Sequence, residues 1–330
     1  MNFNTEVWKH LESNPPTGDK LVARLALPEI TKRLYYAIDT NKIRHLLVPV
    51  SENDECNDSQ SRGLTVATRE LIVVGSEPTK YIDIICHDDS GHIIFDVIGK
   101  EIAEKLEKGK SHEIITNVIS KWRHFWGQPL RELLTYEELI GLFAELWFLY
   151  HWLFPQVGYL DAVKRWRGPF SSRHDFEWKD KSVEVKATTN VQGRIHKIHG
   201  IEQLSPPENG NLLFFSLRIR EEQGSNNTLP AFIASCQEKL KENLDALSIF
   251  ENTLAVAGYS PLHDDEYSKF KFRIVDEKLY KVTDNFPRLT TNSFKDGLPS
   301  GIGYIEYVID LDGFENLCLA TSSKDGIELI

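Results

Sequence analysis

Short hydrophobic runs alternate with polar turns over the first third of the chain, and this pattern predicts strands followed by helices. Runs that are short, β-branched and bounded by turn residues are typical of strands. They occur at 45–50, 64–68, 70–74, 81–86 and 92–98. Apolar residues at three- and four-residue spacing then predict amphipathic helices over 98–109 and 112–126. A polar, acidic loop is expected at 51–63.

The rest of the chain begins with a long apolar helical pattern. Thr135 and Glu138 have the spacing of a capping box, and the helix is expected to end before Pro155. Buried-looking or strand-rich segments follow at 211–219, 270–283 and 301–311, and helices are expected over 230–247 and 249–259. The sequence "GQPL" at 127–130 marks a plausible boundary. We therefore expect an N-terminal α+β domain at 1–128 and a second domain at 129–330.

Composition narrows the class of protein. The 330 residues are 41% hydrophobic, enough to bury a sizeable core, and no apolar run reaches the roughly 18 residues that span a membrane. The first residues lack the features of a signal peptide. Four well-separated cysteines form no CxxC pair, which argues against a structural zinc site or a disulfide framework. A cytoplasmic location is expected.

The net charge of −11 argues at first against a nucleic-acid partner, but the charge is unevenly distributed. Residues 161–200 hold nine Lys/Arg against five Asp/Glu, so this window is +4 and the remaining chain is −15. On charge alone, an ordinary surface fluctuation is slightly favoured over a binding site as the explanation of that imbalance. If the window binds phosphates, the basic side chains expected to contribute are Arg165, Arg167, Arg173, Arg194 and Lys197.

The stretch "HDFEWKDKSVEVKA" at 174–187 carries the candidate chemistry. Side chains two apart on a strand share a face, so Glu184 and Lys186 are expected to lie together while the valines face a core. A hairpin would return Asp175 to their neighbourhood. Two close carboxylates repel unless a cation lies between them, and an all-oxygen site suits Mg²⁺. Lys186 could then steady a phosphate or position an attacking water.

An ordinary solvated ion pair is the competing interpretation of this stretch. The acid-x-Lys triplet also occurs at Glu177/Lys179 and at Asp276/Lys278. Only the triplet at Glu184/Lys186 lies in a β-branched strand and follows a nearby aspartate across a tight turn. That context favours it as the functional triplet.

Glu145 is a second candidate, because it lies among apolar residues of the long helix at 136–154. A carboxylate in such surroundings needs compensation. A buried arginine, a helix end or the metal ion held by Asp175 and Glu184 would supply it, and the sequence leaves these open. His196 and His199 are three apart and could share a helix face, where surface or phosphate contact is favoured over zinc binding. Trp166 is expected to be a packing residue.

Taken in order, these residues resemble the PD-(D/E)XK nuclease superfamily. More specifically, the chain looks like the PD-(D/E)XK family of uncharacterised proteins encoded in restriction-modification and phage-defence gene clusters. The resemblance rests on seven motifs: "GLFAEL" (141–146), "WRGP" (166–169), "HDFEW" (174–178), "VEVKAT" (183–188), "EQL" (202–204), "GY" (258–259) and "FPRL" (286–289).

The resemblance implies an α/β fold with a restriction-endonuclease-like core, a mixed sheet flanked by helices. It also implies Mg²⁺-dependent DNA cleavage, with Mn²⁺ as a substitute. By analogy, Glu145, Asp175, Glu184 and the carbonyl of Val185 would hold metal, and Asp175, Glu184 and Lys186 would be catalytic.

Two departures from the superfamily pattern affect these expectations. His174 replaces the proline of the superfamily name, a change that several functional members tolerate. Gln203 is followed four residues later by Pro207 instead of tyrosine, which argues against the RecB-like exonucleases. Gln203 could contact DNA, bond a metal ligand or cap a helix.

The expected function is a restriction or phage-defence endonuclease acting on double-stranded DNA. A non-catalytic subunit that grips DNA or a partner protein is the alternative, and an RNA nuclease is a second one. The intact acid-acid-x-Lys set favours the enzyme, because a pure binding protein has no need to crowd carboxylates. Cutting both strands calls for two active sites, so a homodimer is expected, with other defence subunits as further candidate partners.

Overall fold

The computed structural model describes residues 5–31, 33–51, 55–57, 63–107, 109–123, 133–295, 297–298 and 300–325. The chain folds into two compact units, Met1–Leu130 and Arg131–Ile330. The boundary expected at 127–130 lies outside the described residues, as does most of the loop expected at 51–63. None of the helices in the described ranges has the length and apolar character needed to cross a membrane.

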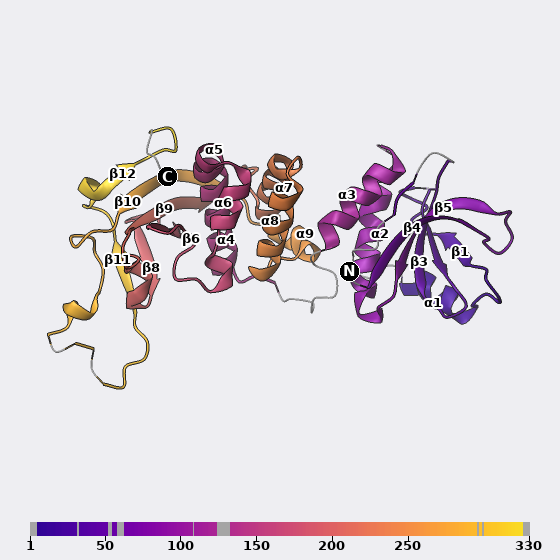
Figure 1. The fold of residues 1–330 in the computed structure, drawn as a ribbon, viewed down its shortest axis with the longest axis horizontal. Coiled ribbons are helices and arrows are strands. Elements are labelled where there is room, and N and C mark those ends of the chain that lie inside the picture. Colours follow the sequence, from indigo (N-terminus) through magenta and orange to yellow (C-terminus); the bar gives the residue numbers. More distant parts are fainter. Residues whose placement is uncertain are drawn as a thin grey trace. The chain divides into compact units, whose positions relative to one another are not determined.

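The N-terminal unit is built on a five-stranded antiparallel sheet. Its strands are β1 (Val22–Leu25), β2 (Tyr35–Ile38), β3 (Arg44–Pro49), β4 (Leu64–Leu71) and β5 (Thr79–Cys86), in the spatial order β1-β2-β3-β5-β4. Its helices are α1 (Thr5–Ser13), α2 (His92–Leu106) and α3 (Ser111–Arg123). Trp8 of α1 packs against the ring of Tyr36 of β2, and a Cβ added at Gly99 of α2 would lie 3.5 Å from the same ring. Both helices therefore cover the same face of the sheet (Figure 1).

The strand expected at 92–98 is wrong, because these residues form the first two turns of α2. The buried residues of this stretch, Ile94, Phe95 and Ile98, are followed at helical spacing by Ile102 and Leu106. The apolar run and the amphipathic pattern after it are thus one helical stripe. A short apolar run cannot by itself distinguish a buried helix from a strand.

The C-terminal unit combines a second sheet with most of the helices. Its helical elements include α4 (Tyr136–Phe148), the π-helical turn η2 (Leu149–Leu153), α5 (Phe154–Val157), α6 (Tyr159–Arg165), the 3₁₀ turns η3 (Gly168–Phe170) and η4 (Ile201–Leu204), α7 (Leu229–Leu240), α8 (Leu244–Val256) and α9 (Asp264–Tyr267). Its strands are β6 (Phe176–Glu177), β7 (Lys181–Thr188), β8 (Ile195–His199), β9 (Asn211–Glu221), β10 (Phe272–Lys281), β11 (Glu306–Asp310) and β12 (Cys318–Ala320).

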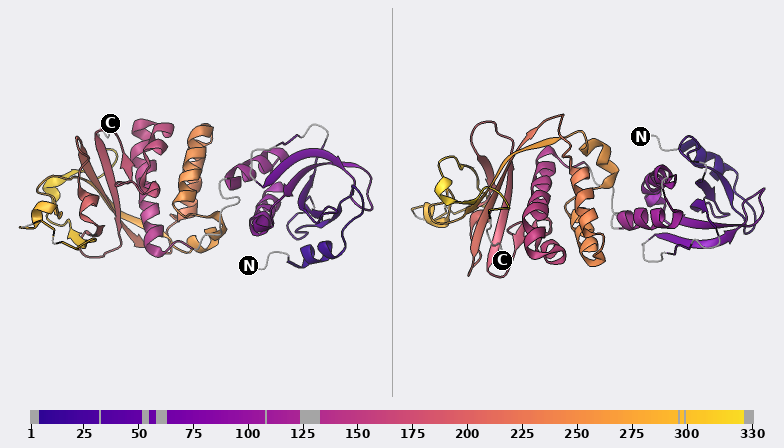
Figure 2. Two further views of the ribbon diagram at one scale, coloured as in Figure 1. Left: turned by 60° about the horizontal axis from the view of Figure 1, so that its bottom comes forward. Right: turned by 90° about the horizontal axis from the view of Figure 1, so that it is seen from above.

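The large sheet is mixed, with the strand order β12-β10-β9-β7-β6. Only β7 and β9 run parallel, and the segment between them contains β8 and η4. Helices cover one face of this sheet, whereas β8 and β11 form a two-stranded ribbon on the other (Figures 1 and 2). This arrangement confirms the expected α/β class, a mixed sheet with flanking helices.

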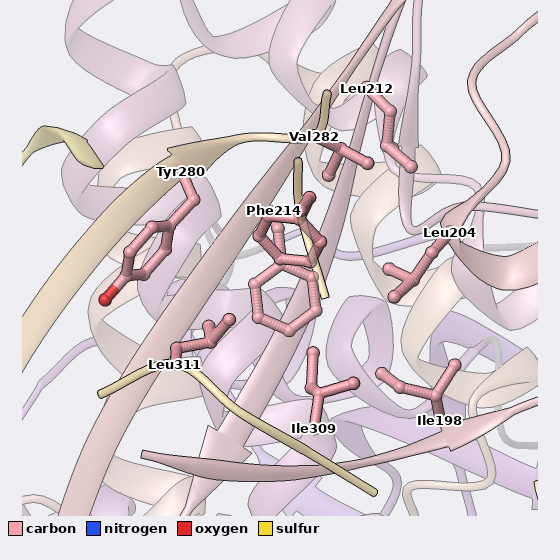
Figure 3. Close-up of a cluster of buried hydrophobic side chains, with 9 residues drawn as sticks. Ile198, Leu204, Leu212, Phe214, Tyr280, Val282, Ile309 and Leu311 are labelled. Carbon is pink, nitrogen blue, oxygen red and sulfur yellow. The ribbon is translucent and has the colours of Figure 1, made fainter. Parts of the chain in front are cut away.

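Adjacent residues of β9 contribute to the two opposite faces. Phe215 contacts Phe148 of α4, with ring centroids 4.9 Å apart. Phe214 belongs to a buried cluster that includes Leu212, Ile198 and Ile309 (Figure 3). This alternation follows from the two-residue period of a strand. It makes β9 and its neighbour β7 a rigid support for side chains at the sheet edge.

The helix limits differ from the expected ones at two places. The capping box of Thr135 and Glu138 is confirmed, but the helical path continues through η2 and includes Pro155 in the first turn of α5. Proline is tolerated there because a first-turn N–H needs no helical partner. The two helices expected over 230–247 and 249–259 are present as α7 and α8, but the break between them comes earlier, because Asn243 caps α8 by accepting a hydrogen bond from Ala246 N (3.0 Å).

Candidate active site

The structure brings the four main candidate side chains of the sequence together at one edge of the mixed sheet. Glu145 lies on α4, Asp175 directly precedes β6, and Glu184 and Lys186 lie on β7. Val185 N donates to Asp175 Oδ2 (2.7 Å), so the short hairpin returns Asp175 to β7 as expected. Lys186 Nζ lies 3.0 Å from Glu184 Oε1.

The two faces of β7 differ as the alternation predicts. Val183 and Val185 are buried, and Val185 pairs in register with Phe215, which faces the helices. Glu184 pairs with Phe214 and therefore lies on the opposite face. Glu184 is only 1% exposed, so its carboxylate has lost nearly all contact with bulk water.

Burial raises the pKa of all three acids, and repulsion by neighbouring carboxylates adds to the shift at Glu145 and Glu184. Burial, reinforced by Asp175, raises the pKa of Glu184 to about 8, although Lys186 opposes this shift. Burial and then the charge of Asp175 raise the pKa of Glu145 well above its ordinary value. Burial also raises the pKa of Asp175. A group of carboxylates that resists ionisation in this way can be relieved by a cation placed among them.

The acids around Lys186 favour its charged form. Burial opposes its charged form, but Glu184 and Asp175 outweigh burial and raise the pKa of its ammonium. Lys186 is therefore a permanent cation at neutral pH. One lysine cannot balance three carboxylates, so the site keeps an excess of acidic groups.

Glu145 is stabilised by a neutral donor. The indole Nε1 of Trp166 donates to Glu145 Oε2 at 2.6 Å. The charged groups that shift the Glu145 pKa are Asp175, Glu184 and Lys186. Of the compensating partners that the sequence left open, a buried arginine is therefore not the one observed.

The loop that follows Trp166 holds Asp175 through the main chain. The amides of Arg167 and Gly168 both donate to the Asp175 carbonyl, at 2.7 and 3.0 Å. A Cβ at Gly168 would lie 2.6 Å from Asp175 Oδ1 and 3.2 Å from Glu145 Oε2. Glycine is thus needed where this loop passes the two acids.

Replacing Gly168 with alanine should destabilise the protein by about 1–3 kcal/mol, because the added methyl group overlaps Asp175. Thermal melts measure this effect. Gly141→Ala is the matched control, since a Cβ at this α4 position meets no atom within 4 Å. The control should be neutral or more stable by about 0.5–1 kcal/mol. Equal stability of the two variants would contradict the close packing described above.

Gln203 is a further hydrogen-bond partner of Glu184. Its Oε1 accepts a hydrogen bond from His199 N (2.8 Å), and its side chain also bonds Glu184 and lowers the pKa of that carboxyl. Of the roles that the sequence left open for Gln203, the observed contact is with a candidate metal ligand. The residue joins the end of β8 to the acid on β7.

The basic residues predicted to bind DNA differ in how exposed their side chains are. Arg167 and Arg173 are exposed, and Arg165 is half-buried with its guanidinium 6.0 Å from the Trp178 ring. Lys197 is exposed and pairs with Glu306 at 2.7 Å. These four side chains remain predicted phosphate contacts.

Arg194 requires a correction. Its side chain is 1% exposed, donates to Ser216 Oγ at 2.6 Å and pairs with Asp276. A guanidinium enclosed in this way is not available to a phosphate. His196 is also buried, with Nε2 2.7 Å from Ser216 Oγ, whereas His199 is exposed. The two histidines lie on the strand β8 and not on a shared helix face.

The donor set suits a hard divalent cation. Glu145, Asp175 and Glu184 offer carboxylate oxygens, and Val185 offers a carbonyl on the strand edge where its N–H bonds Asp175, because both groups of one residue share an edge. Within the described ranges, no group of three or more His, Cys, Asp or Glu side chains is already arranged to hold an ion. The oxygen donors and their negative charge suit such a cation. Each of the three acids also accepts a hydrogen bond from the protein.

The contacts of Trp166 and Gly168 with the acids do not follow from the sequence. Both residues belong to the "WRGP" motif, and Trp166 was expected only to pack. A useful signal was available, since the N–H of a buried tryptophan usually has a hydrogen-bond partner. The identity of that partner, 21 residues away on another helix, could come only from the fold.

Comparison with known proteins gives one match. Residues 4–312 match the family model described as "Putative PD-(D/E)XK family member, (DUF4420)". No curated protein and no solved structure matches the chain.

Proposed function

Since the chain belongs to the PD-(D/E)XK family whose model covers residues 4–312, we propose that it is a Mg²⁺-dependent endonuclease that cleaves double-stranded DNA. The observation that carries the proposal is the cluster of Glu145, Asp175, Glu184 and Lys186 at one sheet edge. A cluster of repelled acids beside a cation is costly for a purely structural role. The proposed biological setting is restriction or phage defence.

In this proposal Glu145, Asp175, Glu184 and the Val185 carbonyl hold Mg²⁺. When bound, the ion polarises the scissile phosphate and lowers the pKa of a water molecule. Mn²⁺ offers the same coordination chemistry and is expected to substitute.

The remaining chemistry belongs to the side chains of the chain itself. Lys186 orients the attacking water and stabilises negative charge that develops on the phosphate. Gln203 keeps Glu184 in place, and the loop at 166–169 keeps Asp175 and Glu145 in place. The exposed Arg167, Arg173 and Lys197 and the half-buried Arg165 supply phosphate contacts that do not depend on sequence. A homodimer would bring two such sites to the two strands of a duplex.

Incubation of the purified protein with supercoiled plasmid tests the proposal. We expect nicked and linear products carrying 5′-phosphates with Mg²⁺, and intact plasmid with EDTA. DNA retention in a gel without cleavage under any divalent metal would favour a non-catalytic binding subunit instead. Cleavage of RNA but not DNA would mean that the same site acts on RNA.

Lys186→Ala should slow cleavage by about 10²–10³-fold, the usual effect of losing a group that stabilises a developing charge. The rise in melting temperature on adding Mg²⁺ should change much less, because the metal ligands remain. Lys179→Ala, in the neighbouring acid-x-Lys triplet, is the matched control and should cleave like the parent. If Lys186→Ala lost the Mg²⁺ stabilisation as completely as the cleavage, its assigned role would be wrong.

A further inference from the structure

Trp166 links Glu145 on α4 to the segment that carries Asp175. Its indole donates to Glu145 on α4, and its backbone forms an isolated β-bridge with Phe176, the residue after Asp175. The ring is 1% exposed and packs against Phe250 of α8, with centroids 5.9 Å apart. The orientation of this indole is therefore fixed on several sides.

The type of donor matters for an acid that must bind a cation. A carboxylate has two oxygens, so an N–H bound to one of them leaves the other available. A lysine or arginine in the same place would neutralise Glu145 and compete with an incoming ion. The indole carries no charge, so it can fix the orientation of Glu145 and leave its negative charge available to a metal.

Without such a donor, Glu145 would be free to turn away from its neighbours. Asp175 and Glu184 both repel it, and rotation of the Glu145 side chain would relieve that repulsion. A metal site needs the opposite, which is an acid held in place before the ion arrives. Groups that orient metal ligands typically contribute about 10–100-fold to metal affinity.

We propose that Trp166 is a positioning residue that holds Glu145 ready for a divalent metal ion. The inference rests on the proposed function, because it assumes that Glu145 is a metal ligand. It assigns to Trp166 a role in metal affinity rather than in the chemical step.

The test compares two tryptophans in the full-length protein. Trp166→Phe removes the indole N–H and keeps an aromatic ring. Trp147→Phe is the matched control, because Trp147 also donates to a carboxylate at 2.6 Å, that of Glu277, which additionally accepts from Trp152 at 3.2 Å. Mn²⁺ binding without DNA is followed by electron paramagnetic resonance, and the metal dependence of plasmid cleavage is measured separately.

We expect Trp166→Phe to weaken Mn²⁺ binding about tenfold and to raise the metal concentration for half-maximal cleavage by a similar factor. The cleavage rate at saturating metal should stay within about threefold of the parent, because the reacting groups remain. Trp147→Phe should match the parent in both measurements. A merely structural role for Trp166 would lower stability and leave the metal affinity of the folded fraction unchanged.

A second substitution separates loss of the N–H from loss of ring volume. Replacing Trp166 with 3-benzothienylalanine keeps the bicyclic shape and substitutes sulfur for the N–H. The same tenfold weakening in this variant supports the inference, and parent-like Mn²⁺ binding overturns it. A parent protein that neither binds Mn²⁺ nor cleaves DNA would overturn the proposed function as well, whereas an active parent with an unaffected Trp166→Phe variant would overturn only the role of Trp166.

Discussion

Glu184→Gln and Asp175→Asn should each reduce plasmid cleavage by about 10²–10³-fold or more while leaving the fold intact. Both changes keep the shape of the side chain and remove a negative charge that the proposed Mg²⁺ site needs. In the Asp175→Asn variant, the new amide oxygen could still accept the hydrogen bond from Val185 N that joins the hairpin to β7. Loss of activity would then report loss of charge and not loss of structure.

Time courses of supercoiled plasmid loss measure the effect, and circular dichroism checks the fold. Glu177→Gln is the matched control, since Glu177 lies on the same hairpin and belongs to the neighbouring acid-x-Lys triplet. The control should cleave at the parental rate. Parent-like cleavage by Glu184→Gln or by Asp175→Asn would remove that residue from the proposed site.

The sequence identified the acidic residues because their positions obey local rules. The strand period of two places Glu184 and Lys186 on one face, and a tight turn between short strands returns Asp175 to them. Glu145 stood out because it lies in an apolar stretch of a helix. Each of these arguments needs only a few neighbouring residues.

At the candidate site, the errors and omissions arose where partners are distant in sequence. Arg194 was expected to bind DNA because it lies in a basic window, yet its partners Ser216 and Asp276 are 22 and 82 positions away. The pattern of charges along a sequence does not show which of the charged side chains are buried. The bond between Trp166 and Glu145 likewise depends on how α4 and the loop at 166–169 pack together.

Without metal, the contribution of Glu184 to stability should fall as pH rises, which is the reverse of the usual behaviour of a carboxyl group. Burial and Asp175 raise the pKa of Glu184 from 4.5 to about 8, so the folded state holds more protons than the unfolded state between these values. Where the folded state binds more protons, stability falls as pH rises. In EDTA we therefore expect the melting temperature of the parent to fall relative to that of Glu184→Gln between about pH 5 and pH 8; the comparison cancels the contribution of buried His151, His174 and His196, whose lowered pKa values act in the opposite direction. Mg²⁺ should reduce this loss, because an ion offsets the repulsion.

Glu145→Gln tests the same repulsion at a single position. The amide oxygen can still accept the Trp166 N–H, so the substitution removes charge and keeps the hydrogen bond. The pKa of Glu145 is raised by burial and by Asp175, so its ionised form destabilises the metal-free protein at neutral pH. We therefore expect Glu145→Gln to be more stable than the parent in EDTA at pH 8.

The same variant should gain less from Mg²⁺ than the parent, because stabilisation by a ligand falls as its affinity falls. Melts of parent and Glu145→Gln at pH 5 and pH 8, each with EDTA and with Mg²⁺, measure both effects. The gain in EDTA should be smaller at pH 5 than at pH 8, because a carboxyl group whose pKa is raised in the folded state costs more stability as pH rises. If Glu145 were instead satisfied by a buried cation, glutamine would cost roughly 3–5 kcal/mol and leave the Mg²⁺ increment unchanged. That result would exclude Glu145 from the metal site, and Trp166 would lose its proposed role with it.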